Sequence, residues 1–169
     1  MFDDLASAVR LLHILSAILL FGTGLGTAFH GLASNLSRDV RAIAVANRNV
    51  VLADWLFTTP TVILQPITGI WLAWLLGWPL TSGWIVWTLV LYVLAGACWL
   101  PVVWLQLRMK QMADAAVASG EPLPPHYRRY FGWWFALGWP AFTAMVLIVV
   151  LMVYRPVLWV PAFVEEIAL

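Results

Sequence analysis

The stretch LLHILSAILLFGTGLGTAFHGLAS, residues 11–34, decides the fold class of this chain. A helix that crosses a bilayer needs about 20 mainly apolar residues, and this stretch supplies a nearly unbroken run of them. It also carries His13 and His30 near its two ends, with glycines at positions 22, 24 and 26 between them. The stretch therefore predicts a membrane-spanning helix whose histidines and glycines need a separate explanation.

The composition of the whole chain also indicates an integral membrane protein. Of its 169 residues, 63% are hydrophobic and 10% are charged, whereas typical soluble domains have about 45–50% and 25%. The net charge of +1 indicates no basic surface for nucleic acid, and the single cysteine excludes an intrachain disulfide. We expect no cleavable signal peptide, because the first apolar run is too long for the apolar core of one.

Four segments are long and apolar enough to span a bilayer: residues 11–33, 50–78, 84–107 and 130–154. They predict an all-α fold, a polytopic membrane four-helix bundle that forms one domain over residues 1–169. The second helix is expected to extend backward into the cytoplasm, because the segment before residue 50 contains no helix breaker.

The connections between the spans differ in composition. The third loop is not expected to be one rigid helix, because it contains Gly120, Pro122, Pro124 and Pro125. The segment 156–169 is short and holds two prolines and two glutamates, so it predicts an interfacial tail.

The basic residues predict the orientation of the bundle. Seven of the nine lysines and arginines lie in the first and third loops, which share one side of the membrane when there are four spans. The positive-inside rule puts that side in the cytoplasm. We therefore expect a multi-pass protein of the bacterial inner membrane with both termini on the outer side.

Gly22 and Gly26 are four residues apart and form a GxxxG motif, which lets a second helix approach closely. They predict a helix-packing face, and this face could also join the chain to a second copy or to a membrane complex. Two interpretations stay open. The small and polar seam along the first helix serves packing alone, or the space that the glycines leave admits a cofactor or substrate.

His13 is the strongest candidate for a ligand, because an ionisable residue inside a membrane is a functional hypothesis by default. Imidazole is also the usual proximal ligand of haem iron. The alternative is a hydrogen bond to a lipid headgroup or a backbone carbonyl. Aligning the ends of antiparallel helices places His13 in the outer half of the membrane.

Four further residues form a predicted intramembrane polar group: His30, Asp54, Gln65 and Gln106. Asp54 needs a partner or water, because a carboxylate costs at least ~2.5 kcal/mol in a spanning helix. We expect it to pair with Arg108, Arg129 or His30.

Gln65 is placed near the midplane, beside Pro66, and the other three members in the inner half. Pro60 and Pro66 are expected to open the second helix between residues 58 and 68, and Pro66 frees the carbonyl of Val62. Pro101 and Pro140 interrupt the third and fourth helices, so the four prolines together predict a splayed bundle with an interior space.

The chain resembles a known family in the segments LLHILSAILLFGTGLGTAF, VVLADWLFTTP, QPITG, LAGACWLPVVWLQLRM and FALGWPAF. They resemble an uncharacterised bacterial family of predicted four-helix integral membrane proteins. The position of His13 also resembles, more weakly, that in the copper-resistance D proteins and the HemJ-type protoporphyrinogen oxidases. That second resemblance implies haem b with His13 as an axial ligand.

A haem at His13 would need a further ligand from another residue, because the second and third helices contain no histidine. Met145 and Met152 are the candidates by depth, unless the sixth ligand is not a protein group or the site is open. The absence of a CxxCH motif excludes covalent c-type haem.

Three functions remain open: a haem-b redox protein, a transporter of a small molecule or copper, and a non-catalytic subunit of a membrane complex. A tryptophan-rich sensor of the translocator type would need a fifth span. Whether the chain is an enzyme stays undecided.

Overall fold

The computed structural model describes residues 2–160, with side chains from residue 4 onward. All secondary structure in this part of the chain is helical: α1 (Phe2–Ser37), α2 (Val40–Ala53), the π-helix η1 (Asp54–Thr58), α3 (Thr59–Leu75), α4 (Gly83–Ser119) and α5 (Tyr127–Tyr154). Since α2, η1 and α3 follow one another without a break, the helices make four rods. All four are long and apolar enough to cross a membrane, which confirms the predicted fold class.

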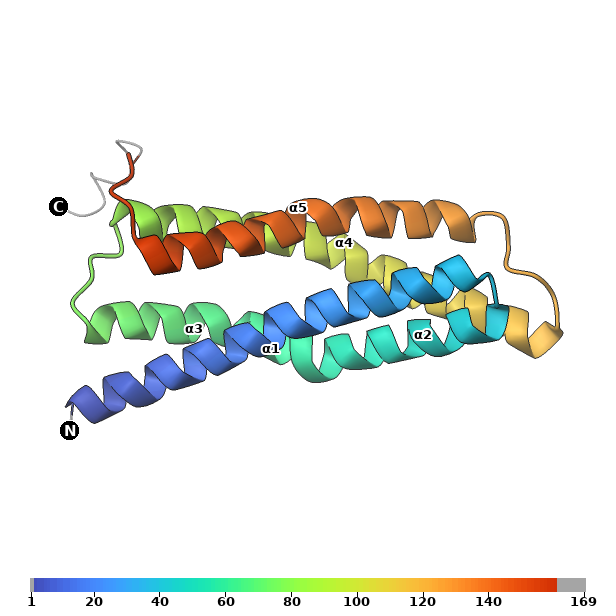
Figure 1. The fold of residues 1–169 in the computed structure, drawn as a ribbon, viewed down its shortest axis with the longest axis horizontal. Coiled ribbons are helices and arrows are strands. Elements are labelled where there is room, and N and C mark those ends of the chain that lie inside the picture. The colour runs from blue at the N-terminus through green and yellow to red at the C-terminus, as the bar shows by residue number, and fades with distance from the viewer. Residues whose placement is uncertain (1, 161–169) are drawn as a thin grey trace.

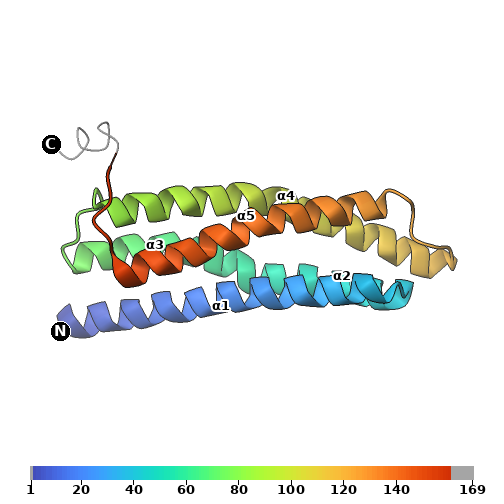
Figure 2. The same ribbon diagram turned by 45° about the horizontal axis from the view of Figure 1, so that its top comes forward.

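The four rods run up and down along one axis (Figure 1). The start of α1, the short connection from α3 to α4 and the end of α5 lie at one end, whereas the α1–α2 and α4–α5 connections lie at the other (Figures 1 and 2). We call these the terminal end and the loop end. The first and third loops therefore share a side, as the sequence predicts.

The rods pack as two pairs that meet at the loop end. α1 packs along α2 and α3, and α4 packs along α5, while α2 joins the pairs through α4. The main apolar core lies where they meet and consists of these buried residues: Ile43, Ala44, Val102, Leu105, Met109, Ala113, Tyr127 and Trp134. Toward the terminal end, the α1/α3 pair and the α4/α5 pair enclose space, which is described below.

Several helices are longer than the predicted spans. α2 begins at Val40, so the expected extension of the second helix is confirmed. Asp39 caps this helix and accepts a hydrogen bond from the backbone N–H of Arg41 at 2.8 Å.

α4 continues through the first part of the third loop to Ser119, past the predicted span that ends at residue 107. The breakers in that loop all follow Ser119, and the residues before them favour a helix. Gly120, with a φ of 73°, then ends α4 in the left-handed conformation.

The ends of the second and fourth rods lie close to the predicted ones. The second rod ends at Leu75 rather than 78, and Arg155 ends α5 in the left-handed conformation with a φ of 44°. Residues 156–160 of the predicted interfacial tail are not helical. The rest of that tail, residues 161–169, lies outside the described residues.

The predicted opening of the second rod occurs one turn earlier than expected. It is the π-helix η1, which ends two residues before Pro60. Proline lacks an N–H and its ring clashes with the preceding turn, and the wider π-turn accommodates both effects. The backbone N–H of Thr59 reaches back five residues to Asp54 O, and the Thr61 hydroxyl donates to Phe57 O at 2.6 Å.

Candidate functional site

One space between the rods, the His13 cavity, has a volume of about 830 Å³ and lies toward the terminal end. All four rods contribute to its walls, which are mostly apolar. The residues on it that matter below are His13, Gln65, Gly69, Met152, Arg10 and Arg155. Its volume falls in the range of about 300–1,000 Å³ that is typical of small-molecule and cofactor sites.

His13 belongs to α1, and its side chain packs against α3. Its Nδ1 lies 2.8 Å from the hydroxyl oxygen of Thr68, a side chain that is only 1% exposed. The edge of the ring lies over Gly69, where a Cβ would come within 3.2 Å of His13 Cε1. Gly69 is therefore the residue that lets the imidazole fit against α3.

The Thr68 hydroxyl fixes the tautomer that we assign to His13. The hydroxyl oxygen also lies 2.8 Å from Leu64 O and 3.3 Å from Gln65 O, so its one hydrogen is directed at these carbonyls. Thr68 then accepts a hydrogen bond from the Nδ1–H of His13. This tautomer leaves a lone pair on Nε2, which makes no hydrogen bond to another described residue. A fixed Nδ1–H is the arrangement by which proteins orient a metal-binding imidazole.

A second polar contact between α1 and α3 supports the backbone at His13. The Gln65 amide donates to His13 O at 2.9 Å and lies 2.6 Å from the hydroxyl oxygen of Ser16. The Ser16 hydroxyl itself donates to His13 O at 3.0 Å. The Gln65 side chain thus contacts the backbone at His13, although the sequence places Gln65 near the midplane and His13 in the outer half of the membrane.

A second space, the Asp54 cavity, lies about halfway along the bundle and has a volume of about 340 Å³. Its walls include Asp54 and Thr58 of η1, Tyr92, Trp99 and Gln106 of α4, and Trp134, Trp139 and Phe142 of α5. Asp54 and Gln106 are each 6% exposed and lie close together. The Thr58 hydroxyl donates to Asp54 Oδ1 at 2.8 Å.

The expected ion pair of Asp54 is wrong: among the described residues, no cationic group lies within salt-bridge distance of this carboxylate. The acidic side chain that does pair with cations is Asp114, which meets Arg48 at 2.7 Å and Lys110 at 3.3 Å. Asp54 lies about two turns from Arg48 along its rod, so its carboxyl group bonds to a neighbouring threonine instead.

A family model described as a predicted integral membrane protein (DUF2269) matches residues 7–156, which is nearly the whole chain. The chain belongs to this family. The first resemblance drawn from the sequence is thereby confirmed, and the family description names no activity. Searches of curated proteins and of solved structures found no match.

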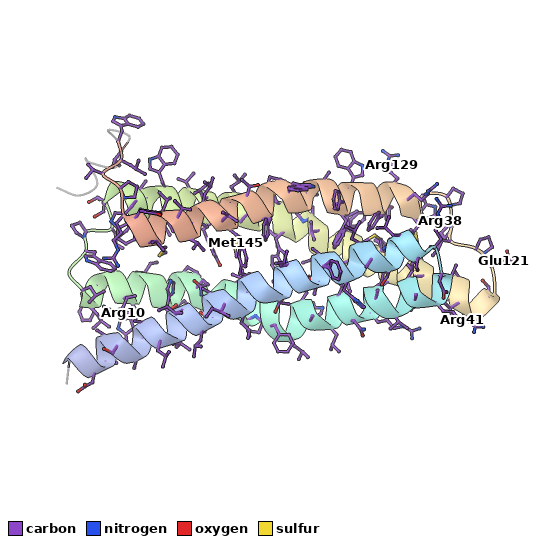
Figure 3. The ribbon with its side chains drawn as sticks, in the orientation of Figure 1. Arg10, Arg38, Arg41, Glu121, Arg129 and Met145 are labelled. Atoms are coloured by element: carbon purple, nitrogen blue, oxygen red, sulfur yellow. The ribbon has the colours of Figure 1, made fainter. Side chains whose placement is uncertain are left out.

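The structure of this DUF2269 protein separates several residues that the sequence grouped. His30 is exposed, so only Asp54 and Gln106 of the predicted polar group share the Asp54 cavity. Met152 lines the His13 cavity, whereas Met145 lines the Asp54 cavity midway along the bundle (Figure 3). Within the described part of the chain, no group of three or more His, Cys, Asp and Glu side chains could hold a metal ion.

The predicted packing glycines do not bring two helices of this chain together. A Cβ at Gly22 or Gly26 would have no neighbouring atom within 4 Å. The close approach on α1 occurs instead at Gly31, where a Cβ would lie 3.1 Å from Cη2 of Trp134. Gly22 instead lines the His13 cavity and Gly24 the Asp54 cavity, whereas Gly26 lines neither.

Sequence reasoning missed two residues of the site. Gly69 carried no signal beyond its position in an apolar helix. Tyr92 donates its hydroxyl to Val62 O, the carbonyl that Pro66 leaves free. The orphan carbonyl was predictable, but the donor on another helix was not.

Proposed function

We propose that this protein is a haem-b-binding redox protein of the membrane in which His13 is an axial ligand of the iron. The observation that carries the proposal is the oriented imidazole: Thr68 holds Nδ1 at 2.8 Å on the wall of an 830 Å³ cavity. Histidine and methionine are the commonest protein ligands of b-type and c-type haem iron. His13 and Met152 both line this cavity.

The rest of the cavity fits an apolar macrocycle with two carboxylates. Most of the lining is aliphatic or aromatic, and the two charged residues on it are Arg10 and Arg155. The Arg155 guanidinium lies over the Trp78 ring, 4.1 Å from its centroid, and 5.6 Å from that of Trp84. Arginines that are positioned in this way can pair with carboxylates in two-point hydrogen bonds.

When bound, haem b would supply one-electron redox chemistry at its iron. The protein's part is to hold and tune the group. Thr68 and Gln65 fix His13 and its backbone, Gly69 leaves room for the ring, and the apolar walls exclude water. An apolar, water-free environment and a hydrogen bond to the ligating imidazole both alter the reduction potential of a bound metal.

The test is an absorption spectrum of protein purified from cells supplied with a haem precursor, together with a pyridine haemochrome assay. We expect a Soret band in the wild type and its loss in His13→Ala. His126→Ala is the matched control, because His126 is exposed at the start of α5 and lines neither cavity. Folded wild-type protein that carries no haem would overturn the proposal.

A location in the bacterial inner membrane with both termini outside is the second part of the proposal. Arg38, Arg41 and Arg129 lie at the loop end, opposite Arg10 (Figure 3), and the positive-inside rule assigns such an end to the cytoplasm. Alkaline phosphatase fused after residue 154 should be active, and the same enzyme fused after residue 38 inactive. The reverse pattern would refute this orientation.

The role of a non-catalytic subunit is a second candidate function, and the bare glycine face of α1 favours it. Gly22 and Gly26 are both exposed, and a Cβ at either would meet no atom of the chain within 4 Å; Gly22 also lines the His13 cavity, whereas Gly26 lines neither cavity. Small residues at such spacing suit a helix of a second copy or of another membrane protein. The oligomeric state of Gly26→Leu tests this candidate.

A further inference from the structure

The Asp54 cavity carries an unusual set of unsatisfied polar atoms. Four buried side-chain nitrogen or oxygen atoms of the described residues lack a hydrogen-bond partner, and three of them belong to residues that line this cavity. They are Asp54 Oδ2, Trp99 Nε1 and Trp134 Nε1. Asp54 is 6% and Trp134 7% exposed. Buried polar groups in native proteins are nearly always hydrogen-bonded, so three orphans around one space need an explanation.

The neighbouring polar side chains leave these atoms without a hydrogen bond, although the Gln106 amide lies close to the Asp54 carboxyl group. The Thr58 hydroxyl is already committed to Asp54 Oδ1, and the Tyr92 hydroxyl to Val62 O. Leaving a buried donor or acceptor unpaired costs about 1–3 kcal/mol for each group. The cost is removed if a bound molecule donates to the carboxylate and accepts from the indole N–H groups.

The cavity restricts what that molecule is. To satisfy the unpaired atoms, the bound molecule needs one hydroxyl donor and at least one oxygen acceptor. Trp99, Trp134, Trp139 and Phe142 provide flat aromatic walls, on which another aromatic ring stacks favourably. A volume of about 340 Å³ lies at the lower end of the usual range for ligand sites, about 300–1,000 Å³, so it suits a single ring rather than a macrocycle. The position between membrane-spanning helices requires a neutral, lipophilic molecule.

We propose that the Asp54 cavity binds the hydroxylated aromatic ring of a quinol, with one quinol hydroxyl donating to Asp54 Oδ2 and a quinol oxygen accepting from the Trp99 or Trp134 indole. The π-helix η1 contributes to the site by placing Asp54 and Thr58, four residues apart, both buried beside this space. Single π-turns inside helices are frequent at functional sites. The proposal does not require haem at His13, which lines the other cavity.

The experiment measures binding of tetramethylhydroquinone to the purified full-length protein in detergent, under anaerobic and reducing conditions, by isothermal titration calorimetry. The comparison ligand is its dimethyl ether, which keeps the ring and the oxygen acceptors but has no hydroxyl donor. We expect the ether to bind at least tenfold more weakly. Asp54→Asn should weaken quinol binding at least tenfold, because a charge-assisted hydrogen bond is lost.

Controls separate this site from folding and from the haem proposal. Asp114→Asn makes the same substitution on α4 but outside the cavity, and should leave the affinity unchanged. His13→Ala should also bind the quinol normally, even where it abolishes haem binding. If Asp54→Asn fails to fold, Trp134→Phe, which removes one N–H and keeps an aromatic ring, should weaken binding severalfold. Equal affinity for the quinol and its ether, or no binding by the wild type, would overturn the proposal.

Discussion

The contact between His13 and Gly69 predicts an effect of adding one methyl group. In an ordinary helix position, Gly→Ala stabilises the fold by about 0.5–1 kcal/mol, since glycine has more freedom to lose on folding. At Gly69 the new Cβ would lie 3.2 Å from His13 Cε1, whereas non-bonded carbons prefer about 3.5–4.0 Å. The imidazole must therefore retreat by several tenths of an ångström.

That retreat stretches the bond from His13 to Thr68, which is 2.8 Å long. A hydrogen bond of this kind contributes a net ~0.5–1.5 kcal/mol, which cancels or exceeds the gain from alanine. The gain from alanine is common to both variants, so we expect Gly69→Ala to be about 0.5–1.5 kcal/mol less stable than the control Gly132→Ala, whose Cβ meets no atom within 4 Å. Reversible unfolding in mixed detergent micelles measures the difference. Equal stabilisation by both substitutions would refute the contact.

Three further substitutions test the polar contacts between the helices by the same unfolding assay. Thr68→Val should destabilise the protein by about 1–3 kcal/mol, because it leaves a buried His13 nitrogen unpaired, and Thr68→Ser should restore most of the loss. Tyr92→Phe should cost about 0.5–2 kcal/mol by orphaning Val62 O; no measurable cost would contradict the predicted cross-helix bond. Asp114→Asn should change the stability by less than about 1 kcal/mol, since its partner Arg48 is 54% exposed; a larger loss would show that this pair matters more than its exposure suggests.

The number and order of the helices followed from the sequence because the bilayer imposes both length and polarity on each span. Where the helices end did not follow. α4 runs on to Ser119 because the residues after the span favour a helix in water as much as in lipid. Hydropathy marks where the apolar run stops, and only a breaker such as Gly120 marks where the helix stops.

The depth and rotation of individual polar residues were harder to predict. Aligning helix ends put His13 in the outer half of the membrane and Gln65 near the midplane. In the structure the Gln65 side chain contacts the backbone of His13, in a rod that a π-turn interrupts. The rotation of a membrane helix is set by its neighbours. One sequence therefore could not show that His30 faces outward while Asp54 faces a cavity.

The aromatic residues of the Asp54 cavity show a similar limit. Most of the twelve tryptophans suit the two membrane interfaces, and the sequence places Trp99 and Trp139 deeper, where they either pack or line a flat apolar ligand. That Trp99 and Trp134 each bury an indole nitrogen without a partner depends on the tilt of two helices relative to a third. Composition reveals that such side chains are available, and packing decides which of them line an interior space.

The GxxxG motif of α1 predicts a closely packed helix, but within this chain no helix packs against Gly26. Each glycine in a helix interior costs about 1 kcal/mol relative to alanine, yet Gly26 contacts nothing within the chain and lines neither cavity. If a second helix from outside the chain packs there, Gly26→Leu should shift the purified protein from an oligomer to a monomer in sedimentation experiments. Its unfolding midpoint as a monomer should stay unchanged, because residue 26 is exposed and the Cβ of the new side chain meets no atom of its own chain within 4 Å. Gly132→Leu on α5 is the matched control and should leave the oligomer intact. An assembly that survives Gly26→Leu would show that this face of α1 is covered by lipid.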